Sequence, residues 1–372
     1  MESTLNKQPY INIAGIGDIM PGGILNGEAG RFIDDKVIAV LKQADIRVGT
    51  LETAVGNEPT FYDEKMSRRA DVIYVKDDTL KRLVELDINI VSLANNHFFD
   101  LGPKGAVHAI ELLDSLGVQH CGAGRNLEEA GKPVVFEKDG KSVAFLAFCD
   151  WRDETVGWCP FATETNPGVN PMFDDYVVEQ ITKYKAMYDF IVVIPHWGKE
   201  HTFVTTRPVY ELARKMVDAG ADVILGGHTH RIQPVATTKA AVIAYSMGNF
   251  LFPDRLIVKP RSTYYPETPL DIRSLPTTSG YPFVELVTLK LWKPLARIGE
   301  IVTVGLRPGR KSVDLRFVKL DGANTLQLCT LPLSTRLILG WQKMWLTHLP
   351  YPQYASAFVS LKSVVKRLIH RR

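Results

Sequence analysis

Two histidines stand one residue apart directly after a run of branched aliphatic residues, in the segment ADVILGGHTH (221–230). The run predicts a buried strand, which places the imidazoles of His228 and His230 at its end. Imidazole binds metal ions and exchanges protons near neutral pH. A lone histidine after a strand is more often structural, so the pair indicates a site only if other ligand-type side chains lie close by.

Polar residues of the metal-ligand type also follow four other predicted strands. They are Asp18, Glu52, the run Asn95, Asn96 and His97, and His196. In open α/β sheets ligands bind in the crevice beyond the carboxyl ends of the strands, so these side chains can converge although they are far apart along the chain. Packing alone does not require such residues at five strand ends. We therefore predict a metal or anion site there.

The donor types restrict the metal. Aspartate, glutamate, asparagine and several histidines form a mixed oxygen and nitrogen set, which suits Mn, Fe, Zn or Co better than calcium.

The elements that would position these residues form an α/β pattern. Short β-branched runs predict strands at 11–16, 46–51, 88–94, 142–148, 190–195, 222–227 and 241–246. Between them, apolar residues recur every three or four positions and predict helices at 32–43, 78–86, 105–117, 174–187 and 209–220. This alternation is typical of layered α/β folds.

The pattern changes after residue 252. Residues 253–282 are rich in Pro, Arg, Ser and Thr, which predicts a long loop. The segments 283–292 and 312–320 alternate apolar and polar residues, as half-buried antiparallel strands do. We therefore expect a main domain at 10–252, a loop at 253–282, and a C-terminal α+β extension at 283–372 that ends in a basic helical tail.

The tail YASAFVSLKSVVKRLIHRR (354–372) pairs an apolar stripe with basic residues, which are Lys362, Lys366, Arg367, Arg371 and Arg372. Such a segment can lie on an anionic membrane surface or against a partner. The plainer interpretation is a helix that docks on the domain while its basic end complements the helix dipole.

Composition excludes some classes of function. The 44 Lys and Arg residues nearly cancel the 41 Asp and Glu residues, so nucleic-acid binding is not expected. The four cysteines show no C-x-x-C pair and no metal-like spacing, which indicates reduced thiols. Neither a signal peptide nor a run of roughly 18 apolar residues is present, so we expect a cytoplasmic protein.

The motifs GDIM, TLE, SLANNHFFDLG, CGAGRN, PHWGKEH, GGHTHRIQP and YSMGNFLF occur in this order from about residue 12 to about residue 252. Their order resembles the bacterial CapA family of capsule or poly-γ-glutamate synthesis proteins, whose domain has the calcineurin-like metallophosphoesterase fold. The resemblance implies a layered β-sandwich flanked by helices.

The resemblance also implies roles for particular residues. Phosphoesterases of this fold hold two metal ions, and the matching ligands here are Asp18, Glu52, Asn96, His196, His228 and His230. His97 would be the general acid that protonates the leaving oxygen, or it would orient the scissile phosphate. The ions would activate a water molecule and neutralise phosphoryl charge.

Two positions depart from the pattern of the phosphoesterases. Met20 stands where they have a ligating histidine, and a thioether binds hard divalent ions poorly. Glu52 replaces a shorter aspartate. Both features are shared by CapA-type sequences, and they leave open whether one or two ions bind.

Other residues of the same motifs are candidates for supporting roles. Arg125 could pair with a phosphate or carboxylate, or could cap a nearby carbonyl, and we place it with Asn95 and His97 among the candidate catalytic residues. Asn95 and Asp100 are expected to brace the N-N-H loop. Glu200 and His201 are expected to hydrogen-bond to the ligating side chains without binding the metal themselves.

Two functions of different classes are compatible with these residues. The first is a metal-dependent phosphoesterase associated with capsule or poly-γ-glutamate synthesis, whose small-molecule or polymer substrate carries phosphate or carboxylate groups. The second is a non-catalytic accessory protein that binds glutamyl polymer or a partner protein. Fold alone does not choose between them, and the oligomeric state stays open.

Overall fold

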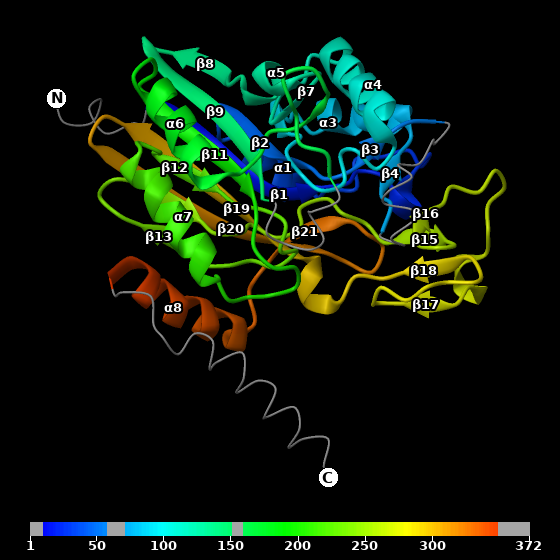
Figure 1. Ribbon diagram of the computed structural model, residues 1–372. Coiled ribbons are helices and arrows are strands. Elements are labelled where there is room, and N and C mark those ends of the chain that lie inside the picture. Colours follow the sequence, from blue (N-terminus) through cyan, green and yellow to red (C-terminus); the bar gives the residue numbers. More distant parts are fainter. Residues whose placement is uncertain (1–9, 58–70, 151–158, 349–372) are drawn as a thin grey trace.

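The structure is a computed structural model that describes residues 10–57, 71–150 and 159–348. Two β-sheets face each other and helices lie outside them, so the molecule is layered (Figure 1). The main hydrophobic core joins Val48 of one sheet to Val192 of the other. The predicted α/β class and the flanked β-sandwich are confirmed.

The first sheet has the strand order β21–β20–β19–β1–β2–β5–β6. Its strands are β1 (Ile11–Ile19), β2 (Ile46–Leu51), β5 (Ile90–Ser92), β6 (Gln119–Cys121), β19 (Ile298–Arg307), β20 (Arg310–Leu320) and β21 (Leu326–Cys329). Strands β1, β2, β5 and β6 run parallel, whereas β19, β20 and β21 are antiparallel additions beside β1. The parallel strands therefore all end at one edge of the sheet.

The second sheet has the order β13–β14–β12–β11–β9–β8. Its strands are β8 (Val134–Lys138), β9 (Lys141–Cys149), β11 (Phe190–His196), β12 (Val223–Leu225), β13 (Val235–Thr237) and β14 (Val242–Ala244). Strands β9, β11, β12 and β14 are parallel. Smaller sheets pair β3 (Ala54–Val55) with β4 (Tyr74–Val75), and β7 (Ala123–Gly124) with β10 (Gly168–Val169).

Helices alternate with the strands along the chain and also follow the last strand. They are α1 (Asp35–Leu41), α3 (Lys81–Glu85), α4 (Gly102–Ser115), α5 (Leu127–Gly131), α6 (Asp174–Lys185), α7 (Arg207–Asp218) and α8 (Leu333–His348), with the 3-10 turns η2 (Gly23–Leu25), η3 (Asp77–Leu80), η4 (Ile272–Ser274) and η5 (Pro294–Arg297). Helices α6 and α7 pack on the outer face of the second sheet through a separate apolar cluster (Figure 1). Every strand and helix predicted before residue 252 is present, although several are shorter than predicted. None of the helices in the described ranges is both long and apolar enough to cross a membrane.

The region after residue 252 differs from the prediction. The expected loop 253–282 contains β15 (Arg255–Val258), β16 (Ser262–Thr263) and β17 (Thr277–Thr278), which form a four-stranded sheet with β18 (Thr288–Lys290). Of the predicted strand 283–292, only Thr288–Lys290 forms a strand. Proline and serine indicated turns, but they did not exclude short strands between the turns.

Strand β19 was not predicted, although it is long. All but two of its residues are buried, so it lacks the alternation by which β20 was recognised. It pairs with β1, with Ile11 opposite Leu306. The C-terminal extension therefore completes the first sheet and is not a separate unit beside it. The predicted basic tail at 354–372 lies outside the described residues.

Strand β1 approaches another chain segment very closely at Gly17. The pairing of β1 with β2 shifts in register between Gly15 and Asp18, and the backbone N–H of Asp18 donates to Gly248 O at 2.9 Å. A Cβ atom at Gly17 would lie 1.8 Å from that carbonyl oxygen. A side chain at this position would push apart the segments that position Asp18.

Gly17→Ala is therefore expected to lower the free energy of unfolding by about 1–3 kcal/mol or more, because backbone atoms cannot move aside as a flexible side chain can. Urea denaturation measures the change. Gly322→Ala is the matched control, because a Cβ atom at Gly322 meets nothing within 4 Å. Equal stability of the two variants would contradict the close approach.

Candidate metal centre

The strand ends of both sheets bring the predicted ligands together. Asp18 lies in β1, Glu52 follows β2, and Asn96 follows β5, all in the first sheet. From the second sheet, His196 is the last residue of β11, and His228 and His230 follow β12. All six side chains are at least nine-tenths buried. The carboxyl ends of the parallel strands thus meet between the layers, as the pattern predicted.

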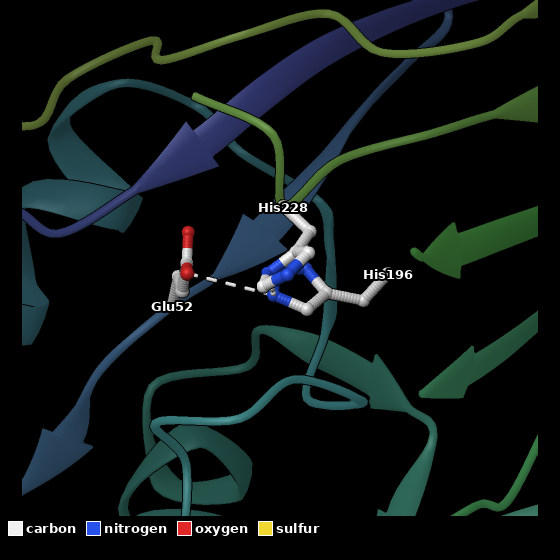
Figure 2. Close-up of side chains that lie close together, drawn as sticks. All are labelled: Glu52, His196 and His228. Carbon is white, nitrogen blue, oxygen red and sulfur yellow. Dashed lines mark hydrogen bonds and ion pairs between the residues drawn. The ribbon is translucent and has the colours of Figure 1, made fainter. Parts of the chain in front are cut away.

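One donor group consists of Glu52, His196 and His228, whose side chains point toward one another (Figure 2). His196 Nε2 lies 3.5 Å from Glu52 Oε1 and 3.1 Å from His228 Nδ1. The same nitrogen lies 2.9 Å from Asn96 Oδ1. Four potential ligand atoms from four strand ends therefore share one small volume.

A second donor group consists of Asp18, Glu52 and His230. His230 Nε2 lies 3.6 Å from Glu52 Oε1, and His230 Nδ1 lies 3.7 Å from Asp18 Oδ2. Glu52 belongs to both groups, and the same oxygen, Oε1, faces His196 and His230. The carboxylate of Glu52 is thus placed as a bridge between two positions that could each hold a metal ion.

The surroundings of Asp18 fit a cation. Asp18 Oδ2 accepts a hydrogen bond from the backbone N–H of His228 at 3.1 Å, whereas buried Oδ1 has no hydrogen-bond partner in the described residues. A Cβ atom at Gly227 would lie 2.4 Å from Oδ1, so glycine keeps the space beside this oxygen open. A buried carboxylate oxygen in this position needs a positive charge or a donor.

Burial also sets the protonation of these groups. It raises the pKa of Asp18 to about 7, although the N–H of His228 opposes the change. Burial, with the neighbouring imidazoles, lowers the pKa values of His196 and His230 well below the usual value. The imidazoles are therefore neutral at pH 7, the form that binds metals, and a bound cation would favour ionised Asp18.

The backbone at the H-x-H pair is unusual. His228 and His230 have φ angles of +83° and +49°. These lie in the left-handed region, which residues other than glycine rarely adopt. Between them, the hydroxyl of Thr229 donates to Arg231 O at 2.8 Å and contacts Ser246 Oγ at 2.9 Å. Backbone strain of this kind persists where the surroundings hold it, commonly at functional sites.

Asn249 orients His230 and was not assigned a role from the sequence, although it lies in the motif YSMGNFLF. Its Oδ1 is 2.8 Å from His230 Nδ1, and its Nδ2 donates to Ala296 O at 2.9 Å. The amide oxygen therefore accepts the Nδ1 proton, which turns Nε2 toward Glu52. Such an acceptor behind an imidazole ligand commonly fixes its tautomer and strengthens metal binding.

Asn249→Leu is expected to weaken metal affinity by about 10- to 100-fold, because the tautomer of His230 is then no longer fixed. Titration of the metal-free protein with Mn²⁺ against a competing chelator measures the dissociation constant. Asn249→Asp keeps an acceptor oxygen while losing the donor to Ala296, so it should retain most of the affinity. Unchanged affinity in the leucine variant would contradict this role.

His97 is held by a neighbouring carboxylate. Its Nδ1 lies 2.7 Å from Asp100 Oδ2, which also accepts the backbone N–H of Ile73 at 2.6 Å. With the Nδ1 proton directed at Asp100, Nε2 is the nitrogen that can exchange a proton with a substrate. His97 directly follows Asn96, whose Oδ1 lies 2.9 Å from His196 Nε2, so the chain places His97 beside the donor groups.

Two other predicted catalytic residues, Asn95 and Arg125, form their hydrogen bonds with groups outside the two donor groups. Asn95 uses its side chain locally: Nδ2 donates to Leu51 O at 2.8 Å, and Oδ1 accepts the backbone N–H of His97 at 3.0 Å. It therefore braces the segment Asn95–His97 against the end of β2. The exposed guanidinium of Arg125 lies 3.4 Å from Glu129 and 3.5 Å from Glu111.

The partners of Arg125 are thus two carboxylates from nearby in the chain. The sequence had instead suggested a substrate anion or a backbone carbonyl as its partner. None of its hydrogen bonds within the described residues reaches the donor groups. An arginine in a turn motif does not show from the sequence whether nearby acidic residues already neutralise it.

Glu200 and His201 lie next to the donor groups but do not support a ligand in the predicted way. The ring of His201 is 5.8 Å from that of His230, whereas its Nε2 bonds to the hydroxyl of Tyr281 at 2.7 Å. Tyr281 in turn donates to Glu200 Oε2 at 3.1 Å. The ring of Trp292 lies 4.9 Å from that of His230. The region after residue 252 thus supplies aromatic side chains beside the site, which its sequence did not indicate.

Met20 is fully buried in the main apolar core, and its backbone N–H donates to Leu251 O. The position that holds a ligating histidine in the phosphoesterases is therefore a packing residue here. Among the Asp, Glu, His and Cys residues that the structure describes, the second donor group contains only Asp18, Glu52 and His230.

Comparison with known proteins connects this site to a family. The model of the family described as bacterial capsule synthesis protein PGA_cap matches residues 12–254. The chain belongs to this family. The resemblance noted from the motifs is thereby confirmed, and the matched PGA_cap region contains every residue of both donor groups.

Two proteins from Bacillus species are similar in sequence to this PGA_cap family chain. The chain is 34% identical over 248 residues to capsule biosynthesis protein CapA of Bacillus anthracis, a match that covers 64% of this chain and 58% of that protein. It is 30% identical over 243 residues to PGA biosynthesis protein CapA of Bacillus subtilis strain 168, covering 64% and 62%. The chain thus matches about three fifths of the length of these relatives.

Among solved structures, a hypothetical protein from Thermus thermophilus is similar at a TM-score of 0.46 and 15% sequence identity. The similarity covers 87% of this chain and 100% of that one.

Proposed function

We propose that this PGA_cap family protein is a metal-dependent phosphoesterase. The observation that carries the proposal is the position of Glu52 Oε1, which faces His196 in one donor group and His230 in the other. A carboxylate shared by two histidine-containing groups, with a carboxylate-held histidine beside them, is an arrangement suited to phosphoryl transfer to water.

The residues divide into two tasks. Glu52, His196 and His228 would hold one cation, and Asp18, Glu52 and His230 would hold another. A bound divalent cation supplies positive charge to the phosphoryl oxygens and lowers the pKa of water.

Proton transfer is the task of His97. As water attacks phosphorus and the bond to the leaving oxygen breaks, Nε2 of His97 donates its proton to that oxygen. Asp100 holds the ring through Nδ1 and stabilises its protonated form before the transfer.

We infer that the substrate belongs to capsule or poly-γ-glutamate synthesis, because the similar Bacillus proteins are described by those processes. The substrate would be a small or polymer-linked phosphate ester.

The alternative, an accessory protein that binds glutamyl polymer or a partner without catalysis, is favoured by one observation. Met20 packs in the core where the phosphoesterases have a further ligand.

Metal analysis and turnover on the same full-length preparation distinguish the two functions. The phosphoesterase should contain one or two transition-metal ions per chain, lose hydrolysis of p-nitrophenyl phosphate after chelation, and regain it with Mn, Fe, Zn or Co. A chain that takes up no metal, hydrolyses no phosphate ester and yet binds poly-γ-glutamate would overturn the proposal and support the accessory role.

A further inference from the structure

Three basic side chains meet in the four-stranded sheet that contains β15 and β18 (Figure 1). Arg255 in β15 and Lys290 in β18 stand directly opposite each other in an antiparallel pair. Both residues are buried, with exposed fractions of 2% and 5%. The third, Arg261, follows β15. Like charges directly opposite each other destabilise a sheet, so this arrangement needs anions beside it.

Asp71 supplies one negative charge to these side chains. Its Oδ2 lies 2.6 Å from both Arg255 Nη2 and Lys290 Nζ, and its Oδ1 lies 3.8 Å from Arg261 Nε. Among the residues that the structure describes, Asp71 is the only carboxylate within ion-pair distance of any of the three. The set Asp71, Arg255, Arg261 and Lys290, called the basic cluster below, therefore has three positive charges and one negative charge.

Asp71 leaves part of the basic cluster without a partner. The Nε of Arg255 is buried and has no hydrogen-bond partner within the described ranges of the chain. Burial lowers the pKa of Lys290 to about 8, although Asp71 opposes the change, and Arg255 lowers the pKa further. A second anion would accept hydrogen bonds from the guanidinium groups and would stabilise the charged form of Lys290.

Aromatic rings connect the basic cluster to the metal centre. Lys290 Nζ lies 3.5 Å from the centre of the Tyr281 ring, and Arg261 Nη1 donates to Tyr281 O at 3.1 Å. The ring of Tyr281 is 5.6 Å from that of His201, which is 5.8 Å from that of His230. Two rings therefore separate the basic cluster from a residue of the second donor group.

The basic cluster reaches solvent beside Arg261 and Tyr281. The side chain of Arg261 is 19% exposed, and Tyr281 is 38% exposed. The carboxylate of Glu200 lies on the same side, where it accepts the hydroxyl proton of Tyr281. Even when Glu200 is counted with Asp71, the three basic side chains keep an excess of one positive charge.

We propose that the basic cluster binds a carboxylate of the substrate while the phosphate ester lies at the donor groups. A guanidinium group matches the planar shape of a carboxylate and can donate to both of its oxygens. A glutamyl chain, the product named for the similar Bacillus subtilis protein, carries such carboxylates along its length. The inference rests on the proposed function, because it names the part of the substrate that the site would select.

Isothermal titration calorimetry of the full-length protein with penta-γ-glutamate tests the inference. The pentamer should bind the wild type, and its dissociation constant should rise about tenfold or more in Arg261→Gln, which lacks a charged donor. Arg261→Lys keeps the charge and should recover part of the affinity. A pentamer whose free carboxylates are converted to amides should bind weakly to the wild type and equally weakly to Arg261→Gln.

Arg310→Gln is the matched control, because Arg310 is an exposed arginine of β20 outside the basic cluster. This variant loses the same charge and should bind the pentamer as the wild type does. Lys290→Gln tests the cluster from β18 and should also weaken binding. Thermal unfolding shows which variants are folded, and either folded variant of the cluster decides the result.

Absence of pentamer binding to the wild type, or equal affinity in Arg261→Gln and Arg310→Gln, would overturn the inference. So would a loss of inorganic phosphate binding in Arg261→Gln with no change for the pentamer, because the cluster would then hold phosphate. A wild type that binds the pentamer through Arg261 but hydrolyses no phosphate ester would instead contradict the phosphoesterase proposal.

Discussion

Replacing Glu52 with glutamine is expected to remove metal from both donor groups at once and to lower phosphoesterase turnover by about 1000-fold or more. The reason is geometric, because the same oxygen faces His196 at 3.5 Å and His230 at 3.6 Å. An amide retains the shape of the side chain but loses the negative charge that would neutralise a divalent cation. Metal ions contribute several kcal/mol to transition-state stabilisation, and each factor of ten in rate corresponds to about 1.4 kcal/mol.

The measurement combines metal content by mass spectrometry with kcat/KM on p-nitrophenyl phosphate. Glu300→Gln is the matched control, because Glu300 is an equally buried carboxyl in β19, outside both donor groups. Burial raises the pKa of Glu300 to about 8, although Lys343 opposes the change, so this residue is mostly protonated at pH 7 and glutamine resembles it closely. Full metal content in Glu52→Gln would show that Glu52 is not the shared ligand.

The wild-type stoichiometry decides a related point. Two ions lost together in Glu52→Gln would show a bridged pair. One ion in the wild type, lost in the variant, would show that only one donor group is used.

Replacing His97 with alanine is expected to lower kcat by about 100- to 10,000-fold while metal content stays unchanged. The carboxylate of Asp100 holds Nδ1, so Nε2 is the atom that delivers a proton to the leaving oxygen. A poor leaving group needs this proton more than a good one does. The loss should therefore be larger for phenyl phosphate than for p-nitrophenyl phosphate.

The dependence on leaving group separates two roles of His97. Equal losses on the two esters would show that His97 orients the phosphate and does not act as the acid. His108→Ala is the control, because His108 is a half-exposed histidine of α4 that pairs with Asp77. Loss of metal in His97→Ala would instead make this residue part of the metal-binding set.

Most of the elements before residue 252 could be predicted because their signals are local. The buried run of β11 and the apolar spacing of α7 lie within single segments, and each forms as predicted. The residue types at the strand ends were also readable, since parallel strands in a layered fold end at a common edge. Asp18, Glu52 and His196 therefore meet as the sequence indicated.

Features that depend on distant partners could not be predicted. Strand β19 lies beside β1 in the first sheet, although the two strands are far apart along the chain, and no local pattern encodes this pairing. The same topology places Trp292 against His230 and gives His230 its acceptor in Asn249. The pairing of Arg125 with Glu111 and Glu129 was likewise not predicted, because it depends on how the fold places these residues.

The sequence by itself determined the α/β class, the family and the set of side chains that can bind a cation, because periodicity and residue type are properties of short segments. The tertiary structure alone decided that Glu52 is shared by two donor groups, that Asn95 braces a loop, and that three basic side chains meet at Asp71. These properties depend on distances between segments that are far apart along the chain, and those distances are set only when the sheets pack together.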